Sequence, residues 1–326
     1  NISPDLLKFD EFKKLKSNYK TAKNFAIEID KSLKKRKKIK FRSANADESP
    51  GKIYNDYVKS VFFLFNKDDE SEGSVGTGFL VDSSGLILSN WHVTNGAEQI
   101  YVWALPDEGV IDVEKLFTNN EHYFGAVVAE NKKEDLALIK VNGLPIDIKA
   151  INLGHNKEID VGDSVYAIGH PVGLPWSFTA GMVSQKRKNY KWGYEGKLVH
   201  EATVIQMQTP ISTGNSGGPL ISSAGNVIGV NTLMQTQGQN LNFAVAVDHV
   251  RKFIKDNPNV KKINSVETVI KKKFPNAISE DFNNNGTIDT WYIDEDKNGK
   301  FEKVFIDDDE NGFIEGTQYD KEEDDD

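Results

Sequence analysis

The sequence has no cysteine and, among its 326 residues, only three methionines and six histidines. Without cysteine the chain can form no disulfide and can use no thiol in catalysis. So few histidines and methionines also argue against a zinc, haem or copper centre. No run of about 18 apolar residues occurs, so no membrane-spanning helix is expected. The chain starts at Asn1 without a methionine, which is consistent with removal of a leader, although none is visible.

Charge is distributed very unevenly along the chain. The formal net charge is −9, but residues 1–50 carry +7 and residues 277–326 carry −14. Such an asymmetry between the two ends indicates separate segments, and a chain of this length can bury a substantial core. We therefore expect a basic helical segment at 1–50, a β-rich domain at 51–257, a linker or helix at 258–279, and acidic repeats with a tail at 280–326.

The N-terminal segment has the spacing of one amphipathic helix, which would run to about residue 35. Its apolar residues are Leu6, Phe9, Phe12, Leu15, Tyr19, Ala22, Phe25, Ile29 and Leu33. Packing of this helix against the main domain is the favoured interpretation, and self-association or blocking of an active site are the alternatives. The run Lys34–Lys38 has no interleaved aromatic residues, so we expect a solvated helix end rather than a nucleic-acid site.

Twelve short apolar segments, separated by turn residues, lie between about residues 55 and 247. This pattern is typical of a mainly β protein built as a barrel or sandwich. The first six segments are 61–65, 78–81, 86–89, 100–104, 126–129 and 136–141, and the second six are 164–168, 182–185, 204–208, 219–221, 227–232 and 242–247. A helix is expected to begin at Asp248.

The glycine-rich segment Gly214–Leu220 carries a candidate nucleophile, Ser216. Small neighbours allow its hydroxyl to stand exposed on a tight turn, and the backbone N–H groups of Gly214, Asn215 and Ser216 form a candidate oxyanion hole, with Gly214 and Ser216 as the main donors.

A serine hydroxyl is a weak nucleophile and needs a base, and both a base and an orienting acid occur upstream. His92 ends an apolar run and Asp135 directly precedes another. The order His92, Asp135, Ser216 is one of the known orders of a catalytic triad. Among the other histidines, we expect His122, His155, His200 and His249 at the surface or in hydrogen-bonded loops, and His170 in a loop near the active site. The alternatives for the acid are Asp107, Asp112 and Asp147, but none of them precedes so apolar a strand.

Three motifs together resemble those of the HtrA/Deg branch of the trypsin-fold serine proteases. They are Thr77-Gly78-Phe79 followed by His92-Val93, Asp135–Lys140, and Gly214–Leu220. The resemblance covers roughly residues 55–250 and implies a two-barrel protease domain with the active site between the barrels. It also implies that Asn215 replaces the aspartate on which zymogen activation of digestive relatives depends, so that route is not expected here. The chain departs from the family because no PDZ domain is visible after the protease domain.

The same resemblance implies a substrate pocket for the residue before the scissile bond. Its lining residues would be Ile211, Val230, Asn231, Thr232, Asn242 and Phe243. No acid lies where a trypsin-like pocket carries one, so we expect cleavage after small or medium apolar residues.

The acidic C-terminal segment repeats every 13 residues, beginning at Asp281, Asp294 and Asp307, and Asp320 opens an incomplete copy. Oxygen-bearing side chains at positions 1, 3, 5 and 9, with glycine at position 6, match the first part of an EF-hand calcium loop. Position 12 lacks the bidentate glutamate of an EF-hand, and position 13 is always aspartate, so each copy could borrow the next copy's first ligand. This resembles thrombospondin type 3-like and other bacterial calcium repeats, and a disordered acidic tail is the alternative. The expected ligands are Asp281, Asn283, Asn285, Thr287, Asp289, Asp294, Asp296, Asn298, Lys300, Glu302, Asp307, Asp309, Asn311, Phe313, Glu315 and Asp320.

The sequence thus predicts a serine endopeptidase with protein or peptide substrates and a calcium-stabilised C-terminal appendage, secreted or periplasmic because cytosolic calcium is scarce. Calcium would be structural rather than catalytic. No nucleic-acid partner is expected, and self-association stays open. The alternative is a protease-fold protein that no longer cuts and acts as a calcium-dependent binding or adhesion protein. An esterase using the same triad is disfavoured, because the strand–elbow–helix context of such enzymes is missing.

Overall fold

The structure of the chain is a computed structural model. It describes residues 48–66, 73–97, 99–106, 111–118, 122–145, 147–193, 199–234, 241–263, 267–268, 270–271, 274–282, 288–294, 301, 303–306 and 316–319. The predicted N-terminal helix and most of the predicted calcium ligands lie outside these residues. Within them, no helix is long and apolar enough to span a membrane.

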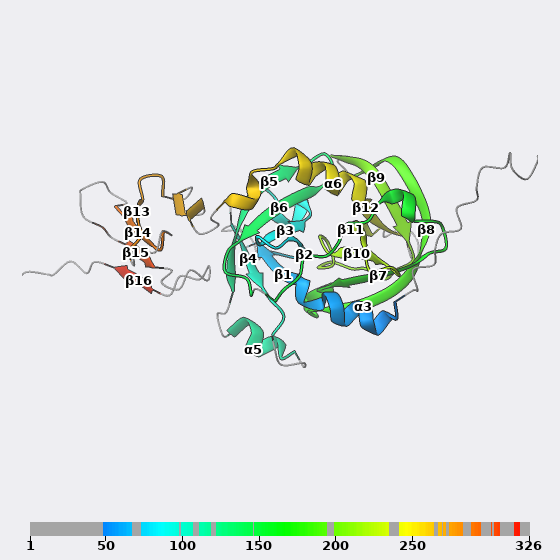
Figure 1. Cartoon of the computed structure of the whole chain (residues 1–326), viewed down its shortest axis with the longest axis horizontal. Helices are drawn as coiled ribbons and strands as arrows, with labels where there is room; N and C mark the ends of the chain where they lie inside the picture. The colour runs from blue at the N-terminus through cyan, green and yellow to red at the C-terminus, as the bar shows by residue number, and fades with distance from the viewer. Residues whose placement is uncertain are drawn as a thin grey trace, which may run out of the picture. The chain divides into compact units, whose positions relative to one another are not determined.

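Twelve strands form two closed six-stranded barrels, which confirms the mainly β, two-barrel prediction (Figure 1). The first barrel consists of β1 (Val61–Asn66), β2 (Ser74–Asp82), β3 (Leu86–Ser89), β4 (Gln99–Trp103), β5 (Tyr123–Asn131) and β6 (Leu136–Val141). The second consists of β7 (Ser164–Gly169), β8 (Ser177–Trp192), β9 (His200–Met207), β10 (Pro219–Ser222), β11 (Val227–Met234) and β12 (Asn242–Ala246). The barrels close through antiparallel pairing of β1 with β4 and of β10 with β7.

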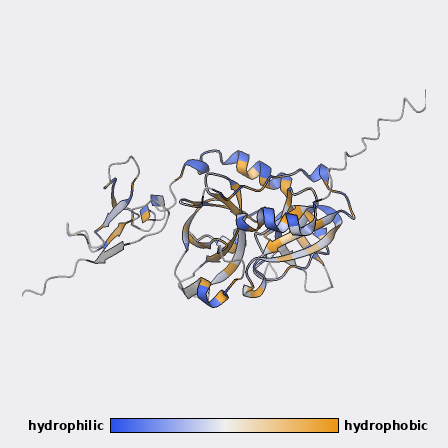
Figure 2. Cartoon of the chain, turned by 60° about the horizontal axis from the view of Figure 1, so that its bottom comes forward, coloured by the Kyte–Doolittle hydropathy of each residue, from blue (hydrophilic) through white to orange (hydrophobic). Residues whose placement is uncertain are grey.

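Each barrel has its own apolar interior, because alternate residues of a strand point to opposite faces of a sheet. Phe62, Leu64 and Ile139 belong to the core of the first barrel, and Val165 and Ile205 to that of the second. A third cluster, which includes Phe63 and Val204, packs the outer faces of strands together with the flanking helices. Figure 2 shows the apolar residues concentrated on the strands.

Short helices flank the barrels. Helix α3 (Pro50–Tyr57) has Ser49 as its N-cap and buries Ile53, and α6 (Val247–Asp256) buries Val247, Val250 and Phe253 on one face. Figure 1 shows α6 running along one side of the two barrels. Other helices among the described residues are α4 (Trp91–Thr94), α5 (Val113–Thr118) and the 3-10 turns η2 (Val58–Ser60), η3 (Asn156–Glu158), η4 (Pro171–Gly173) and η5 (Val260–Lys262).

Strand β8 is much longer than the predicted segment 182–185. It pairs with β7 over its first part and with β9 over its last part, where most of its residues are exposed. The stretch Lys186–Lys188 has no apolar periodicity, so only pairing with β9 makes it a strand.

The acidic repeats form a separate four-stranded antiparallel sheet in the order β13-β14-β15-β16. Its strands are β13 (Ile278–Glu280), β14 (Thr290–Ile293), β15 (Lys303–Ile306) and β16 (Gly316–Tyr319). The last three begin 13 residues apart, so the sequence period is one strand plus one loop. Trp291 and Ile293 are buried in its small core together with Ile270.

This topology corrects the expectation that each loop borrows its last ligand from the next copy. Four residues of β14 separate Asp289, the end of the first loop, from Asp294, the start of the second. At the rise of a β-strand those five steps span about 16 Å. Asp289 and Asp294 therefore lie at opposite ends of β14, and Asp294 is not placed to complete the first loop's ligand set.

His170 is completely buried where the barrels meet. Its ring packs edge-on against Phe63 of the first barrel and Trp176 of the second, and its Nδ1 accepts a hydrogen bond of 3.1 Å from the Trp176 backbone N–H. The Trp176 indole N–H in turn donates to the Val61 carbonyl at 2.7 Å. Burial lowers the pKa of His170 to about 3. The residue thus lies in the loop that was predicted, as a neutral interior group.

Burial of His170 predicts that the stability of the protein depends on pH, and that His170→Asn makes this dependence weaker. An unfolded histidine takes up a proton below about pH 6.5, whereas buried His170 resists it down to about pH 3. The contribution of neutral His170 is therefore fully present above about pH 6.5 and falls by about 1.4 kcal/mol per pH unit below it. Asparagine retains an acceptor for Trp176. Urea unfolding of both proteins between pH 7 and 4 should give a shallower decline for the variant, and parallel declines would contradict the assignment.

Candidate active site

Asp135 occupies the tight turn between β5 and β6, where the backbone takes an unusual conformation. Its φ of 56° lies in the left-handed region, which aspartate tolerates better than most residues. The Asn90 side-chain amide donates to the Asp135 carbonyl at 2.7 Å, and the residue is fully buried. The turn therefore directs its carboxylate into the interior between the barrels.

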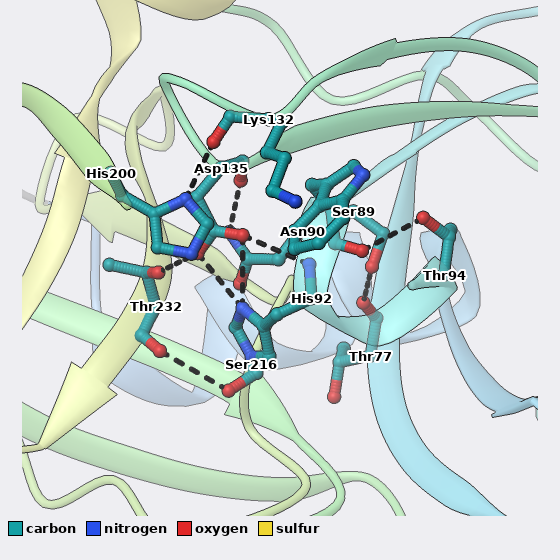
Figure 3. A network of polar contacts seen from close by, with 11 residues as sticks. Thr77, Ser89, Asn90, His92, Thr94, Lys132, Asp135, His200, Ser216 and Thr232 are labelled. Carbon is teal, nitrogen blue, oxygen red and sulfur yellow. Dashed lines mark hydrogen bonds and ion pairs between the residues drawn. The ribbon is translucent and has the colours of Figure 1, made fainter. Parts of the chain in front are cut away.

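The Asp135 carboxylate accepts hydrogen bonds from two N–H groups of His92 (Figure 3). His92 lies in α4, directly after β3, and its backbone N–H donates to Oδ1 at 3.0 Å. Its ring Nδ1 lies 2.9 Å from Oδ2 and 3.0 Å from Oδ1. Because an ionised carboxylate only accepts hydrogen bonds, the imidazole proton is held on Nδ1 and Nε2 is the basic nitrogen.

A third donor comes from the second barrel, because the Thr232 hydroxyl of β11 hydrogen-bonds to Oδ2 of Asp135. Burial by itself raises the pKa of the Asp135 carboxyl, but adjacent His92 and the hydrogen bonds from His92 and Thr232 outweigh burial and hold that pKa below its usual value. The carboxylate is thus kept ionised beside the imidazole.

Ser216 lies in the loop between β9 and β10, and this loop is fastened to the first barrel by Thr77 of β2. The Thr77 N–H donates to the Ser216 carbonyl at 2.8 Å, and its hydroxyl donates to the Gly214 carbonyl at 2.6 Å. The approach is so close that a Cβ on Gly217 would stand 2.1 Å from the Thr77 carbonyl oxygen. Gly217 also has a φ of 85°, so glycine is required there.

The same loop offers two backbone donors near the Ser216 hydroxyl. The Asn215 N–H is bonded to the Ser212 carbonyl at 3.0 Å, whereas no partner is found among the described residues for the N–H of Gly214 or Ser216. Of the three predicted oxyanion-hole residues, Gly214 and Ser216 therefore have amides available, and Asn215 is buried. Gly214 has a φ of 97°, and a Cβ there would meet the His170 carbonyl oxygen at 2.1 Å.

Thr232 connects the three predicted catalytic residues into one network. Its hydroxyl contacts Asp135, and its carbonyl oxygen lies 3.4 Å from the Ser216 hydroxyl (Figure 3). His92 and Asp135 come from the first barrel and Ser216 from the second. The arrangement has the components of acyl transfer: a hydroxyl, an imidazole in a defined tautomer, an orienting carboxylate and backbone donors.

The structure divides the predicted pocket residues between different surroundings. Ile211 lies in the interior cluster of the second barrel, beside Ala244. Val230 and Phe243 belong instead to the cluster on the other face of the sheet, where Phe243 stacks on Tyr190 at 4.9 Å between centroids. This does not support a pocket that Val230 and Phe243 share with Ile211. Among the polar members, Asn231 is buried beside Pro219, Thr232 contacts Asp135, and the Asn242 amide donates to the Thr209 carbonyl at 2.8 Å.

The competing aspartates and two of the remaining histidines lie elsewhere. Asp112 accepts a hydrogen bond from the Lys115 N–H in α5, Asp147 pairs with Lys59 at 3.7 Å, and Asp107 lies outside the described residues. His122 packs on Tyr101, and exposed His155 lies 3.8 Å from Asp248.

His200 and His249, expected to be surface or loop residues, in fact contact the turn that carries Asp135. The Nδ1 of His200 lies 2.6 Å from the Lys132 carbonyl oxygen, and that of His249 lies 2.7 Å from a Glu134 oxygen. Sequence reasoning could not find them, because these contacts join positions 68 and 115 residues apart.

Of the predicted calcium ligands, the structure describes Asp281, Asp289 and Asp294. Asp289 is buried, and its Oδ1 accepts hydrogen bonds from the Phe282 N–H at 3.0 Å and the Thr290 hydroxyl at 2.8 Å. It thereby joins the two ends of the first loop. The described part of the chain contains no cluster of three or more histidine or acidic residues suited to a metal ion.

The family model of the trypsin-like peptidase domain matches residues 76–230. Residues 76–230 are thus similar to a trypsin-like peptidase domain. This segment includes His92, Asp135 and Ser216.

Relatives of this peptidase domain are HtrA-like. The magnetosome formation protease MamE of Magnetospirillum gryphiswaldense is 34% identical over 194 residues, which are 59% of this chain and 23% of MamE. A probable periplasmic serine endoprotease, DegP-like, of Hahella chejuensis is 35% identical over 180 residues, 54% of this chain and 34% of the relative. The chain thus spans well under half the length of these curated relatives. Among solved structures, the HtrA-type protease AlgW with tripeptide has a TM-score of 0.51 at 28% identity, over 64% of each chain.

Removing the Thr232 hydroxyl should impair catalysis without dismantling the site. Thr232→Val keeps the shape but deprives buried Asp135 of one donor, which for a charged acceptor is worth roughly 1.5–3 kcal/mol. We expect peptide hydrolysis at saturating substrate to fall about tenfold or more. Thr232→Ser is the matched control and should retain most activity. Equal rates for the valine variant and the wild type would contradict this role.

Proposed function

We propose that this protein is a serine endopeptidase that uses Ser216, His92 and Asp135 as a catalytic triad. The observation that carries the proposal is the buried Asp135 carboxylate, which accepts from the backbone N–H and the ring Nδ1 of His92 and from the Thr232 hydroxyl. Burial of an ionised carboxylate is energetically costly, and carboxylates buried in this way beside an imidazole are typical of catalytic sites. The HtrA-like relatives of the peptidase domain support the same reaction.

In this mechanism the Ser216 hydroxyl attacks the carbonyl carbon of the scissile bond while its proton passes to Nε2 of His92. Asp135 holds the proton on Nδ1 and stabilises the imidazolium that forms. The N–H groups of Gly214 and Ser216 donate to the developing oxyanion, a contribution typically worth about 10²–10³ in rate per donor. His92 then returns its proton to the leaving amine, and water hydrolyses the acyl-enzyme by the same route.

The proposed specificity is for small or medium apolar residues before the scissile bond. Ile211 lies in an apolar cluster with Ala244 and Val183, and the described residues around it bring no carboxylate that would bind arginine or lysine. A pocket with an apolar wall favours an apolar side chain through burial of its surface.

Cleavage of a peptide library by the wild type and by Ser216→Ala tests both the reaction and the specificity. We expect the wild type to cut after residues such as valine, alanine or leucine, and the variant to lose at least 10³-fold in rate. Ser212→Ala, in the same loop, serves as the control for loop disturbance. Equal cleavage by the Ser216→Ala variant would refute the triad, and dominant cutting after arginine or lysine would refute the pocket.

We further propose that the C-terminal sheet binds structural calcium in its loops. The agreement between the 13-residue period and the strand spacing supports this, because each loop keeps the same relation to its strands. In the first loop, Asp281 and Asp289 would contribute carboxylate oxygens, the ligands that calcium prefers. Because Asp289 and Asp294 lie at opposite ends of β14, the first site would be completed within its own loop. Bound calcium would offset the mutual repulsion of the carboxylates.

Calorimetric titration of the calcium-free full chain tests this proposal. We expect heat from calcium binding and a rise in the melting temperature of the C-terminal sheet, since ligands that bind only the folded state stabilise it. Magnesium at the same concentration should have a much smaller effect, because it favours tighter octahedral sites. Asp281→Asn should weaken binding while peptide hydrolysis is retained. Absence of both binding heat and stabilisation would overturn the proposal.

Action outside the cytoplasm is the setting that we propose for this activity. Calcium sites of modest affinity are filled more readily there, and one relative is named as a probable periplasmic endoprotease.

A further inference from the structure

The turn that carries Asp135, residues 131–135, belongs to the first barrel but is held by the second. The Glu201 N–H of β9 donates to the Lys133 carbonyl at 2.7 Å. His200, also on β9, contacts the Lys132 carbonyl at 2.6 Å and is 2% exposed. Its ring lies between Trp91 and Trp192, with centroids 5.7 and 5.4 Å away. Trp91 directly precedes His92, so both sides of the proposed acid–base pair adjoin this contact.

His249 of α6 makes the most specific of these contacts. Its Nε2 accepts a hydrogen bond of 2.9 Å from the Thr203 backbone N–H. Because Nε2 is an acceptor there, a neutral ring carries its proton on Nδ1. Nδ1 then donates to Oε1 of Glu134 at 2.7 Å, and both side chains are mostly buried. The hydrogen bond to β9 thus fixes the orientation in which the ring holds Glu134.

Glu134 connects His249 to the other end of the turn. Its other oxygen, Oε2, accepts from the Asn131 side-chain amide at 2.8 Å, and its own N–H donates to Asn131 Oδ1 at 3.1 Å. The next residue is Asp135, whose left-handed backbone has an intrinsic cost of about 1–2 kcal/mol. Such a conformation persists only where the surroundings enforce it.

We propose that His249 and Glu134 form a positioning pair, which holds the turn so that the Asp135 carboxylate meets the backbone N–H and the ring Nδ1 of His92. The proposal rests on the triad proposed above. His249 touches no reacting atom, so its contribution is to the precision of the acid–base pair. A misplacement of about 1 Å at such a site can cost up to 100-fold in rate.

Two amide substitutions separate this role from simple packing. In His249→Asn the amide nitrogen takes the place of Nδ1 and keeps a donor for Glu134, but the Thr203 N–H loses its partner. In His249→Gln the side chain reaches the place of Nε2 and keeps an acceptor for Thr203, but the donor to Glu134 is lost. We expect the asparagine variant to retain most of kcat and the glutamine variant to lose about tenfold or more, with KM little changed in both.

The control is His155→Ala, which removes another histidine–carboxylate contact to the same helix, the one between His155 and Asp248. It should leave kcat unchanged. Glu134→Ala should lower kcat as His249→Gln does, and the double variant should fall no further, because the two side chains act as one unit. The reverse order, with asparagine losing activity and glutamine keeping it, would overturn the proposal and assign His249 to packing against β9.

A spectroscopic measurement keeps this test independent of turnover. The proton that His92 Nδ1 shares with Asp135 should give a strongly downfield proton NMR resonance in the full chain. We expect His249→Gln to shift or broaden it, while His249→Asn and His155→Ala leave it in place. An unchanged resonance and unchanged kcat in the glutamine variant would refute the positioning pair. If the wild type shows the resonance but cleaves no peptide, the proposed endopeptidase function has failed and the resonance alone decides the positioning role.

Discussion

The arrangement of the two barrels around the site depends on the hydrogen bonds that the buried Asp135 carboxylate accepts. The carboxylate is fully excluded from water, yet the hydrogen bonds and charge around it hold its pKa low. A charge in that position is tolerated only when donors from several directions surround it. His92 supplies two donors from the first barrel and Thr232 one from the second. Breaking the contact between the barrels would leave this charge without part of its stabilisation.

The same interface is reinforced on either side of the carboxylate. Thr77 fastens the Ser216 loop to the first barrel, neutral His170 fills the space where the barrels meet, and His249 reaches the acid turn through Glu134. Thr77 and His170 join the two barrels directly, and His249 joins helix α6 to the acid turn of the first barrel. The geometry proposed for catalysis is therefore a property of the pair of barrels and not of either one alone.

Much of this could be predicted from the sequence, where the signal is local. Alternating apolar segments predicted the barrel strands, and three motifs predicted that His92, Asp135 and Ser216 form one site. The contacts of Thr232 and His249 gave no signal, because they join positions about a hundred residues apart. The repeat period predicted the spacing of the C-terminal strands. It did not show that Asp289 and Asp294 lie at opposite ends of β14, so the expectation that Asp294 also completes the first loop's ligand set was wrong.

The most direct test of the central claim is covalent labelling by a serine-directed fluorophosphonate, followed by mass spectrometry of the digested full chain. The account predicts one adduct, on Ser216, at a rate that falls strongly in His92→Ala because the hydroxyl then has no base. An adduct at another serine, no adduct at all, or labelling of Ser216 at the same rate without His92 would contradict it.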